Sequence, residues 1–567
     1  MPYFADMYNP KYNNRSQGNY GISFYSLTLL LCILSFSNIT LVVAQAQIKK
    51  AAKPKLVVGI VIDQMRWDYL YRFKSLYSTG GFNRLINEGF SCDNTIIPYI
   101  PTYTAPGHTC IYTGSIPAIN GIVGNNWFER SINKNVYCTD DSSVSGVGSN
   151  SIWGKMSPKN LWGTTISDEL RLSNNFQSRV IGISLKDRGA ILPVGHSANA
   201  AYWYDDVAGK WISSTYYMQA LPQWVDEVNK KNYPASVAGK PWETLLPIEK
   251  YTLSAVDNNK YENNIDGKPP VFPHTIAANS ATKYQEFKFT PYAITYTFDM
   301  ASAAITNEEL GGKGVTDLLA VSISPTDYIG HSFGPNSIEI EDTYLRLDKD
   351  IEKFLSVLDQ KFGKNNYLVF LTADHGVAHV PAFLQEHHIP AGVFNEYGLT
   401  DEINKAAESA LGVKIIVKAV ENSQVYINTD STAYKNRSLS DIKAFVINYL
   451  KAKDYISDVY EMEKVSKASL PDVLKTRIIN GFQPKRCGDI GFIAKPNYFS
   501  GGSTGTTHGS WGGYDAHIPL LWLGWNIKAG KTDDEIFMTD IAPTLAALLN
   551  IQSPSGNVGK VIKEVIQ

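Results

Sequence analysis

Four short apolar runs constrain the fold of this chain more than any other feature. They are rich in β-branched residues and read 56-LVVGIVI-62, 179-RVIGISL-185, 317-DLLAVSIS-324 and 367-YLVFLTA-373. Continuous apolar runs of this length are typical of strands buried on both faces of a mostly parallel sheet. A helical pattern over residues 338–363 separates the last two runs and ends at a glycine. The sequence therefore predicts a doubly wound α/β fold with helices on both faces of the sheet.

Two regions depart from this alternation and indicate inserted subdomains. Residues 196–300 are rich in Tyr, Trp, Pro and Asn without clear periodicity, so we expect an insertion over one edge of the sheet. Residues 380–495 contain strand candidates such as 424–428 beside a helical pattern, which predicts a small α+β subdomain. The core then resumes at 518–524 and ends in a helix near 539–550.

The N-terminus has the pattern of an export signal. A polar start is followed by an apolar run over residues 27–44, and Ala44-Gln45-Ala46 matches a signal-peptidase site. A permanent membrane anchor is the alternative, but polar residues such as Ser35 leave fewer than the ~20 continuous apolar residues that a span needs. We predict a signal peptide over residues 1–46 that is cleaved near Ala46. The mature chain, residues 47–567, is then periplasmic or secreted, without a membrane segment.

Cysteine count and charge limit the remaining function classes. Four cysteines follow the predicted cleavage site: Cys92, Cys110, Cys138 and Cys487. An even number in an oxidising compartment permits two disulfides with three alternative pairings, and the absence of CxxC and CxxH spacings argues against a thiolate zinc site. The formal net charge is only -2, so no basic surface for nucleic acid is indicated. Small molecules are the expected ligands, and we expect a monomer.

Acidic residues and histidines follow three of the predicted strands. Asp63 follows the first run, Asp327 and His331 the third, and Asp374 and His375 the fourth, while His508 lies in 501-GGSTGTTHGSWGG-513. An Asp after a strand commonly caps a turn, so each residue alone has a structural explanation. The pattern occurs three times, however, and the carboxyl ends of parallel strands meet at one edge of a sheet. Six Asp and His ligands suit a two-metal site for Zn²⁺, with Mn²⁺ or Fe as alternatives.

The segment 98-PYIPTYTAPGHTCIYTGS-115 places Thr104 before a short helix predicted over residues 105–113. Pro106 suits the first turn and Gly114 suits the end of a helix, so we expect Thr104 to be the N-cap. Backbone N–H groups and the positive end of the helix dipole would then favour an anion at its oxygen. A threonine hydroxyl needs activation to act as a nucleophile, and a metal ion is sufficient. The six candidate ligands therefore make Thr104 a candidate nucleophile.

Five segments of the chain together resemble the alkaline phosphatase superfamily: VIDQMR, PTYTAPGHTCIYTG, PTDYIGHSFGP, TADHGV and GTTHGS. More narrowly, they resemble the phosphate-irrepressible (PafA-type) alkaline phosphatases, which use threonine. The resemblance covers essentially the whole mature chain and implies an alkaline-phosphatase-like catalytic domain with two Zn²⁺ ions. It implies that one ion is held by Thr104, Asp63, Asp374 and His375. The other would be held by Asp327, His331 and His508.

The resemblance also separates related subfamilies. Nucleotide pyrophosphatase/phosphodiesterases look similar through the threonine, the ligands and Asn125, which is expected to contact a phosphoryl oxygen, but they lack the Lys-x-Arg pair found here as Lys186 and Arg188. A solvated turn is the alternative interpretation of 185-LKDR-188. Two cations at the non-bridging oxygens favour a monoester dianion over a diester. Sulfatases need C/S-x-P-x-R, where this chain has 104-TAPGH-108.

The resemblance therefore implies a broad-specificity phosphatase that hydrolyses small-molecule phosphate monoesters through a phosphothreonine intermediate, with weaker activity on diesters. A phosphodiesterase and a non-catalytic metal-binding relative are the alternatives. Five histidines are left without a role: His108, His379, His387, His388 and His517.

Overall fold

The computed structural model describes residues 53–264, 268–434 and 437–566. The predicted signal peptide, residues 1–46, lies outside these ranges. Within them, every helix is too short or too polar to cross a bilayer.

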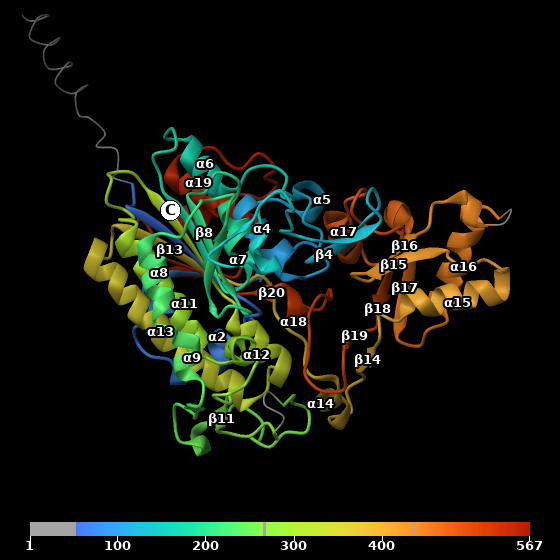
Figure 1. Cartoon of the computed structure of the whole chain (residues 1–567), viewed down its shortest axis with the longest axis horizontal. Helices are drawn as coiled ribbons and strands as arrows, with labels where there is room; N and C mark the ends of the chain where they lie inside the picture. Colours follow the sequence, from blue (N-terminus) through green and yellow to red (C-terminus); the bar gives the residue numbers. More distant parts are fainter. Residues whose placement is uncertain (1–52, 265–267, 435–436, 567) are drawn as a thin grey trace, which may run out of the picture. The chain divides into compact units, whose positions relative to one another are not determined.

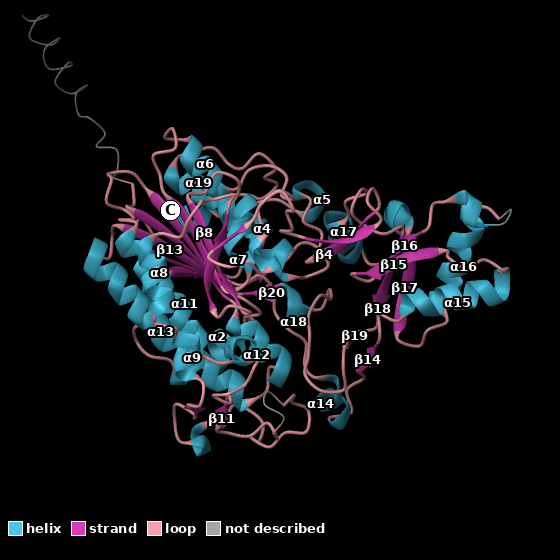
Figure 2. Ribbon diagram, viewed as in Figure 1, coloured by secondary structure: helices cyan, strands magenta, loops and turns pink. Residues whose placement is uncertain are grey.

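A ten-stranded sheet forms the core of the described chain (Figure 2). The strand order in this sheet is β22-β2-β21-β13-β1-β12-β7-β8-β9-β6, with the short strands β22 (Gly530–Thr532), β2 (Phe90–Cys92) and β6 (Gly146–Val147) toward its two edges. Its middle five strands are parallel neighbours: β13 (Tyr367–Thr372), β1 (Leu56–Ile62), β12 (Asp317–Ile323), β7 (Val180–Ser184) and β8 (Ala200–Asp205). Four of these are the apolar runs, and all their residues are buried. β21 (Leu520–Gly524) and β9 (Lys210–Ser214) flank them in antiparallel pairs. The predicted mostly parallel α/β sheet is confirmed.

Helices cover both faces of this sheet (Figures 1 and 2). One face carries α8 (Gln223–Lys230), α11 (Tyr292–Asn307) and α13 (Ile338–Phe362), and the other carries α4 (Thr104–Thr113), α6 (Ile166–Leu172), α7 (Asp187–Ile191) and α19 (Ile541–Leu549). The long helix α13 ends at Gly363, as its sequence predicts, because this residue has a φ of 81° that favours glycine. The doubly wound arrangement is thereby complete.

The structure corrects the prediction for residues 196–300. Both β8 and β9 lie in this range, yet they extend the central sheet rather than cover its edge. Helix α11 begins in the same range and packs against β12 and β7. The strand sequences, 200-AAYWYD-205 and 210-KWISS-214, fill their buried positions with Trp and Tyr rather than with a continuous β-branched run. A criterion based on aliphatic runs therefore misses them.

Residues 380–495 contain a separate four-stranded sheet. Its order is β15 (Val417–Glu421), β16 (Gln424–Ile427), β18 (Ile490–Ala494) and β17 (Ile456–Glu461). Helices α15 (Leu399–Leu411) and α16 (Leu439–Lys451) belong to the same region, and apolar side chains such as Leu399, Val425 and Ile442 form its own buried cluster. These are the elements of an α+β subdomain.

The four cysteines beyond the predicted cleavage site are free thiols. Cys92, Cys110, Cys138 and Cys487 are all buried, and none forms a disulfide within the described residues. The two disulfides that the cysteine count permits are therefore not formed.

Candidate active site

The candidate site lies at the carboxyl ends of the parallel strands. Asp63 directly follows β1, and Asp374 and His375 follow β13. Helix α12 (Pro325–Phe333), which follows β12, carries Asp327 and His331 four residues apart. Because these strands are parallel neighbours, the side chains beyond their ends gather at one edge of the sheet.

The first cluster surrounds the Nε2 atom of His375. Oδ1 of Asp63, Oδ2 of Asp374 and Oγ1 of Thr104 each lie 3.5 Å from this nitrogen. Both carboxylate oxygens are buried, and neither accepts a hydrogen bond from the described part of the chain. Buried polar atoms are rarely left unpaired, and two such oxygens beside an imidazole nitrogen and a hydroxyl form a donor set that fits Zn²⁺. The structure thus brings together the four residues predicted to hold one metal ion.

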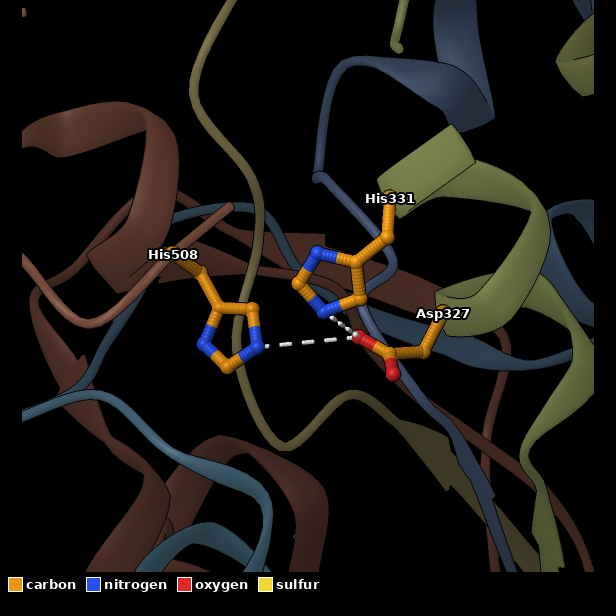
Figure 3. Close-up of side chains that lie close together, drawn as sticks. All are labelled: Asp327, His331 and His508. Atoms are coloured by element: carbon orange, nitrogen blue, oxygen red, sulfur yellow. Dashed lines mark ion pairs between the residues drawn. The ribbon is translucent and has the colours of Figure 1, made fainter. Parts of the chain in front are cut away.

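Asp327, His331 and His508 form the second cluster (Figure 3). Oδ1 of Asp327 lies 3.1 Å from Nε2 of His331 and 3.6 Å from Nε2 of His508. His331 reaches the carboxylate from the same helix, whereas His508 reaches it from the glycine-rich segment 501–513. One ligand atom from each of the three side chains lies within 4.8 Å of the others, a spacing that allows them to share one ion.

Backbone carbonyls orient the three imidazoles of the two clusters. The Nδ1 atoms of His331, His375 and His508 lie 2.7, 2.9 and 2.7 Å from the carbonyl oxygens of Thr506, Gly376 and Thr102. A carbonyl only accepts, so each Nδ1 carries a proton, and in the neutral imidazole Nε2 is the nitrogen that is left to bind a metal. Burial lowers the pKa of His375 and of His508, which favours the neutral form that binds a metal.

Lys186 links the two clusters. It follows β7, and its buried Nζ lies 2.7 Å from Oδ2 of Asp63 and 2.6 Å from Oδ2 of Asp327. Burial alone would lower the pKa of Lys186, but the charges of Asp327 and Asp63 raise it, so the ammonium stays charged. Burial opposes ionisation of Asp327 too, but the charges of His331 and Lys186 hold its pKa well below the usual range. Burial and the neighbouring Asp374 raise the pKa of Asp63. A positive charge therefore lies between the two ligand sets.

Arg188 is held by a separate set of hydrogen bonds. Its Nη1 donates to the hydroxyl of Tyr137 at 2.9 Å, and this hydroxyl donates to Oδ1 of Asp187 at 2.8 Å. Thr139 donates to the other oxygen of Asp187. No described residue accepts a hydrogen bond from the buried Nε of Arg188. The guanidinium therefore keeps donor capacity for an anionic ligand.

Thr104 is the first residue of α4 and not its N-cap, which corrects the prediction. The N-cap is Tyr103, with φ -116° and ψ 162°, while Gly114 ends the helix with φ 60°, as predicted. The N–H of Ala105 donates to Oδ1 of Asn125 at 2.9 Å. This bond leaves the amide NH₂ of Asn125 to donate elsewhere, since no described residue accepts from it. One N–H of the helix end is thus already used to orient Asn125.

Gly107 allows α4 to approach the first cluster closely. A Cβ atom built on Gly107 would lie 2.5 Å from the carbonyl oxygen of Asp374 and 2.6 Å from its Cβ. Neither neighbour can move without displacing the backbone of a candidate ligand, so glycine is required by the contact rather than by a turn.

Three residues that the sequence analysis leaves without a role contact the site. Gln64 donates from Nε2 to Asp327 at 2.6 Å and from its N–H to Asp374 at 3.1 Å. His108 places Nδ1 2.9 Å from the carbonyl oxygen of Thr104 and 3.3 Å from Asp374. Gln64 directly follows Asp63, and His108 lies four residues after Thr104, so their positions in the sequence could have indicated a role in the site. Tyr137 lies on a hairpin strand, β5 (Lys134–Tyr137), and no sequence pattern indicates its role. The other described histidines without a role, His379, His387, His388 and His517, stay outside both clusters.

A cavity of about 450 Å³ opens beside the second cluster. Its lining includes Tyr103, Asn125 and His508 from the site, together with Phe394 and Glu396 from the region 380–495.

Comparison with known proteins gives consistent matches over this chain. The model of the type I phosphodiesterase/nucleotide pyrophosphatase family matches residues 57–515. A Myroides odoratus protein named calcium-transporting ATPase is 50% identical over 547 residues, which cover 95% of this chain and 98% of that protein. Alkaline phosphatase PhoV of Synechococcus elongatus is 48% identical over 551 residues, or 95% and 99% of the two chains.

A third relative is similar in sequence and in structure. Alkaline phosphatase PafA of Elizabethkingia meningoseptica is 49% identical over 519 residues, which cover 91% of this chain and 95% of that protein. A crystal structure of PafA matches with a TM-score of 0.88 at 48% identity and covers 91% of this chain and 99% of the other.

Proposed function

We propose that the chain hydrolyses phosphate monoesters. The premise is that it belongs to the type I phosphodiesterase/nucleotide pyrophosphatase family. Within this family it belongs to the PafA-type alkaline phosphatases, which its motifs resemble. One observation carries the proposal: Lys186 contacts a carboxylate of each ligand set, and Arg188 is a second cation whose charge acts on Lys186. A monoester dianion has one more negative charge than a diester and gains more from two cations.

We expect a Zn²⁺ ion in each cluster. Two buried oxygens that accept no hydrogen bond from a described residue, Oδ1 of Asp63 and Oδ2 of Asp374, support this assignment, and so do the Nε2 atoms of the three histidines. When bound, the ions would act as Lewis acids that favour ionisation of the threonine hydroxyl and neutralise charge on the phosphoryl and leaving oxygens.

The side chains of the site then perform two displacements. Oγ1 of Thr104 attacks phosphorus in line; a P–Oγ bond forms as the bond to the leaving alkoxide breaks, and a phosphothreonine results. Water hydrolyses this ester, which releases inorganic phosphate and restores the threonine. Throughout, Lys186, Arg188 and the amide of Asn125 donate to the non-bridging oxygens, and the amino end of α4 adds its positive dipole.

We also propose export before the enzyme acts. The apolar run and the Ala44-Gln45-Ala46 pattern predict that the mature protein begins at Gln47. Mass spectrometry of the protein in the extracellular or periplasmic fraction tests this; an intact residue 1 in that fraction contradicts it.

The decisive experiment compares the parent with Thr104→Ala on a monoester, a diester and ATP, each with and without a chelator. ATP is included because one relative is named an ATPase. We expect Thr104→Ala to lose at least ~10³-fold in kcat, and single-turnover labelling with ³²P-monoester to modify Thr104 of the parent. Full activity in Thr104→Ala, or activity that survives the chelator, would end this mechanism. A protein that binds metal but is never labelled would be a non-catalytic relative.

A phosphodiesterase is the second candidate, since the family model itself carries that name. Arg188→Ala separates the two. We expect it to reduce kcat/KM for the monoester far more than for the diester. Equal losses on both substrates would favour the phosphodiesterase.

A further inference from the structure

We propose that the cavity beside the second cluster receives the leaving group of the substrate and selects leaving groups that carry an organic ammonium, as amino alcohols do. The inference rests on the proposed function, because it assigns a subsite of the same active site. Its evidence is the position, the charge and the aromatic lining of the cavity.

The cavity begins at the groups expected to hold the phosphoryl group. Asn125 and His508 both line it, and so does Tyr103, which directly precedes Thr104. The ring of Tyr103 lies edge-on to that of His508, with 5.5 Å between centroids. A substituent that extends from the phosphoryl group past His508 therefore enters the cavity. Its volume of about 450 Å³ lies in the range of small-molecule sites and far exceeds that of a metal ion.

Two carboxylates in this cavity lack a counterion. Glu396 is 9% exposed; its Oε1 accepts from the N–H of Ser423 at 2.7 Å, and no described residue donates to Oε2. Glu421 is half-buried and forms neither a hydrogen bond through its side chain nor an ion pair within the described ranges. Burial raises the pKa of Glu396 to about 7, and the charge of Glu421 adds to the rise. Glu396 is therefore ionised under alkaline conditions, and the nearby charge of Glu421 opposes this ionisation.

The other charged residues of the lining do not neutralise this pair. Asp515 is a third acid, and its Oδ2 accepts from the N–H of Ser510 at 2.7 Å. Lys495 is the cation of the lining, but its side chain is exposed. It is not among the groups that act on the pKa of Glu396 or of Glu421.

An organic ammonium ion would stabilise the carboxylates of Glu396 and Glu421 in the cavity, whereas a neutral or anionic group would not. Carboxylates removed from water are costly unless a cation pairs with them. Aromatic rings attract organic cations, and Tyr103, Phe394 and Phe499 all line the cavity. Burial and the charges of Glu396 and Glu421 raise the pKa of Tyr103, so a neutral phenol ring lies close to both carboxylates.

The test uses two esters of the same shape. Phosphocholine and 3,3-dimethylbutyl phosphate differ in that a carbon replaces the quaternary nitrogen, so only the first carries a cationic leaving group. We expect Glu421→Gln and Glu396→Gln each to lower the ratio of kcat/KM for phosphocholine to that for the neutral ester by about 5- to 10-fold. The intrinsic reactivity of each ester is the same with every variant and cancels from this comparison.

Glu408→Gln is the matched control. Glu408 is half-exposed on α15 of the same region, pairs with Lys414 at 3.6 Å and does not line the cavity. We expect this variant to keep the parental ratio. A ratio that stays unchanged in both cavity variants overturns the inference.

A binding experiment keeps the inference testable without turnover or variants. We expect the zinc-loaded parent to bind choline at least ~5-fold more tightly than 3,3-dimethylbutan-1-ol in ligand-observed NMR titrations. Equal affinities overturn the cation site. A choline preference in a protein that hydrolyses no monoester would support the site and overturn the proposed function, so the two failures are distinguishable.

Discussion

Replacing Tyr137 by Phe tests whether a single hydroxyl holds Arg188 in its working position. This hydroxyl accepts from Arg188 at 2.9 Å and donates to Asp187 at 2.8 Å, while the ring itself is retained in Tyr137→Phe. Hydrogen bonds to charged groups contribute about 1.5–3 kcal/mol. If this hydrogen bond positions Arg188, loss of the bond should lower kcat/KM for the monoester by about 10- to 100-fold, because about 1.4 kcal/mol corresponds to a factor of ten.

The assay compares kcat/KM for p-nitrophenyl phosphate and bis(p-nitrophenyl) phosphate, and we expect the diester to lose less. A double variant distinguishes positioning of Arg188 from a purely structural role of the hydroxyl. In an Arg188→Ala background, Tyr137→Phe should cause no further loss of monoester kcat/KM, because the group that the hydroxyl positions is already absent. The control is Tyr71→Phe, which removes an exposed hydroxyl that donates to Asp93 at 2.7 Å. Additive losses in the double variant, or parental monoester activity in Tyr137→Phe, would refute the reasoning.

Three further predictions concern the metal ions, a helix contact and pH. Dialysis against a chelator should abolish monoester hydrolysis and Zn²⁺ should restore it; restoration by Mg²⁺ but not by Zn²⁺ would contradict the ligand assignment. Gly107→Ala should lower the free energy of unfolding by about 1–3 kcal/mol, because the added Cβ would meet the backbone of Asp374. Gly502→Ala is the control: its Cβ would lie 3.7 Å from the nearest neighbour, so the loss should be less than about 1 kcal/mol. Equal urea midpoints for the two variants would contradict this prediction. Burial raises the folded-state pKa of Glu396 from 4.5 to about 7, so the folded protein binds this proton more tightly than the unfolded chain. The free energy of unfolding should therefore fall by on the order of 2–3 kcal/mol as pH rises from about 4.5 to about 7. Urea titrations at pH 5 and pH 8 should show a smaller fall for Glu396→Gln than for the parent. An equal fall in the two proteins would contradict this prediction.

Sequence patterns predict the parallel core because aliphatic runs determine which strands can be buried on both faces. The bounds of β1, Leu56–Ile62, are those of the predicted run. The same criterion fails for β8, where Trp203 and the neighbouring tyrosines fill buried positions that β-branched residues fill elsewhere. Burial of an aromatic strand depends on which helices cover it, and helix placement is a tertiary property that local composition does not encode.

The candidate ligands could be predicted because each follows a strand or begins a recognisable segment. The Thr104 prediction misses by one residue, since the cap is defined by the extended backbone of Tyr103 and not by the capping propensity of threonine. The contact of Tyr137 with Arg188 joins residues that are 51 positions apart. Glu396 lines the cavity from a turn in the region 380–495, far along the chain from Thr104. No spacing in the chain signals such contacts.

The position of His508 has a consequence for when the site can first exist. The other five candidate ligands and Thr104 lie at or before residue 375, but this histidine lies 133 residues beyond the last of them, since 508 minus 375 is 133. Synthesis proceeds from the N-terminus, so a growing chain on the ribosome carries a second cluster that lacks one of its imidazoles until residue 508 has been added. Truncated products that end before this residue are equally incomplete. The order of the ligands along the chain therefore delays completion of the second cluster until well after its other two ligands have been synthesised.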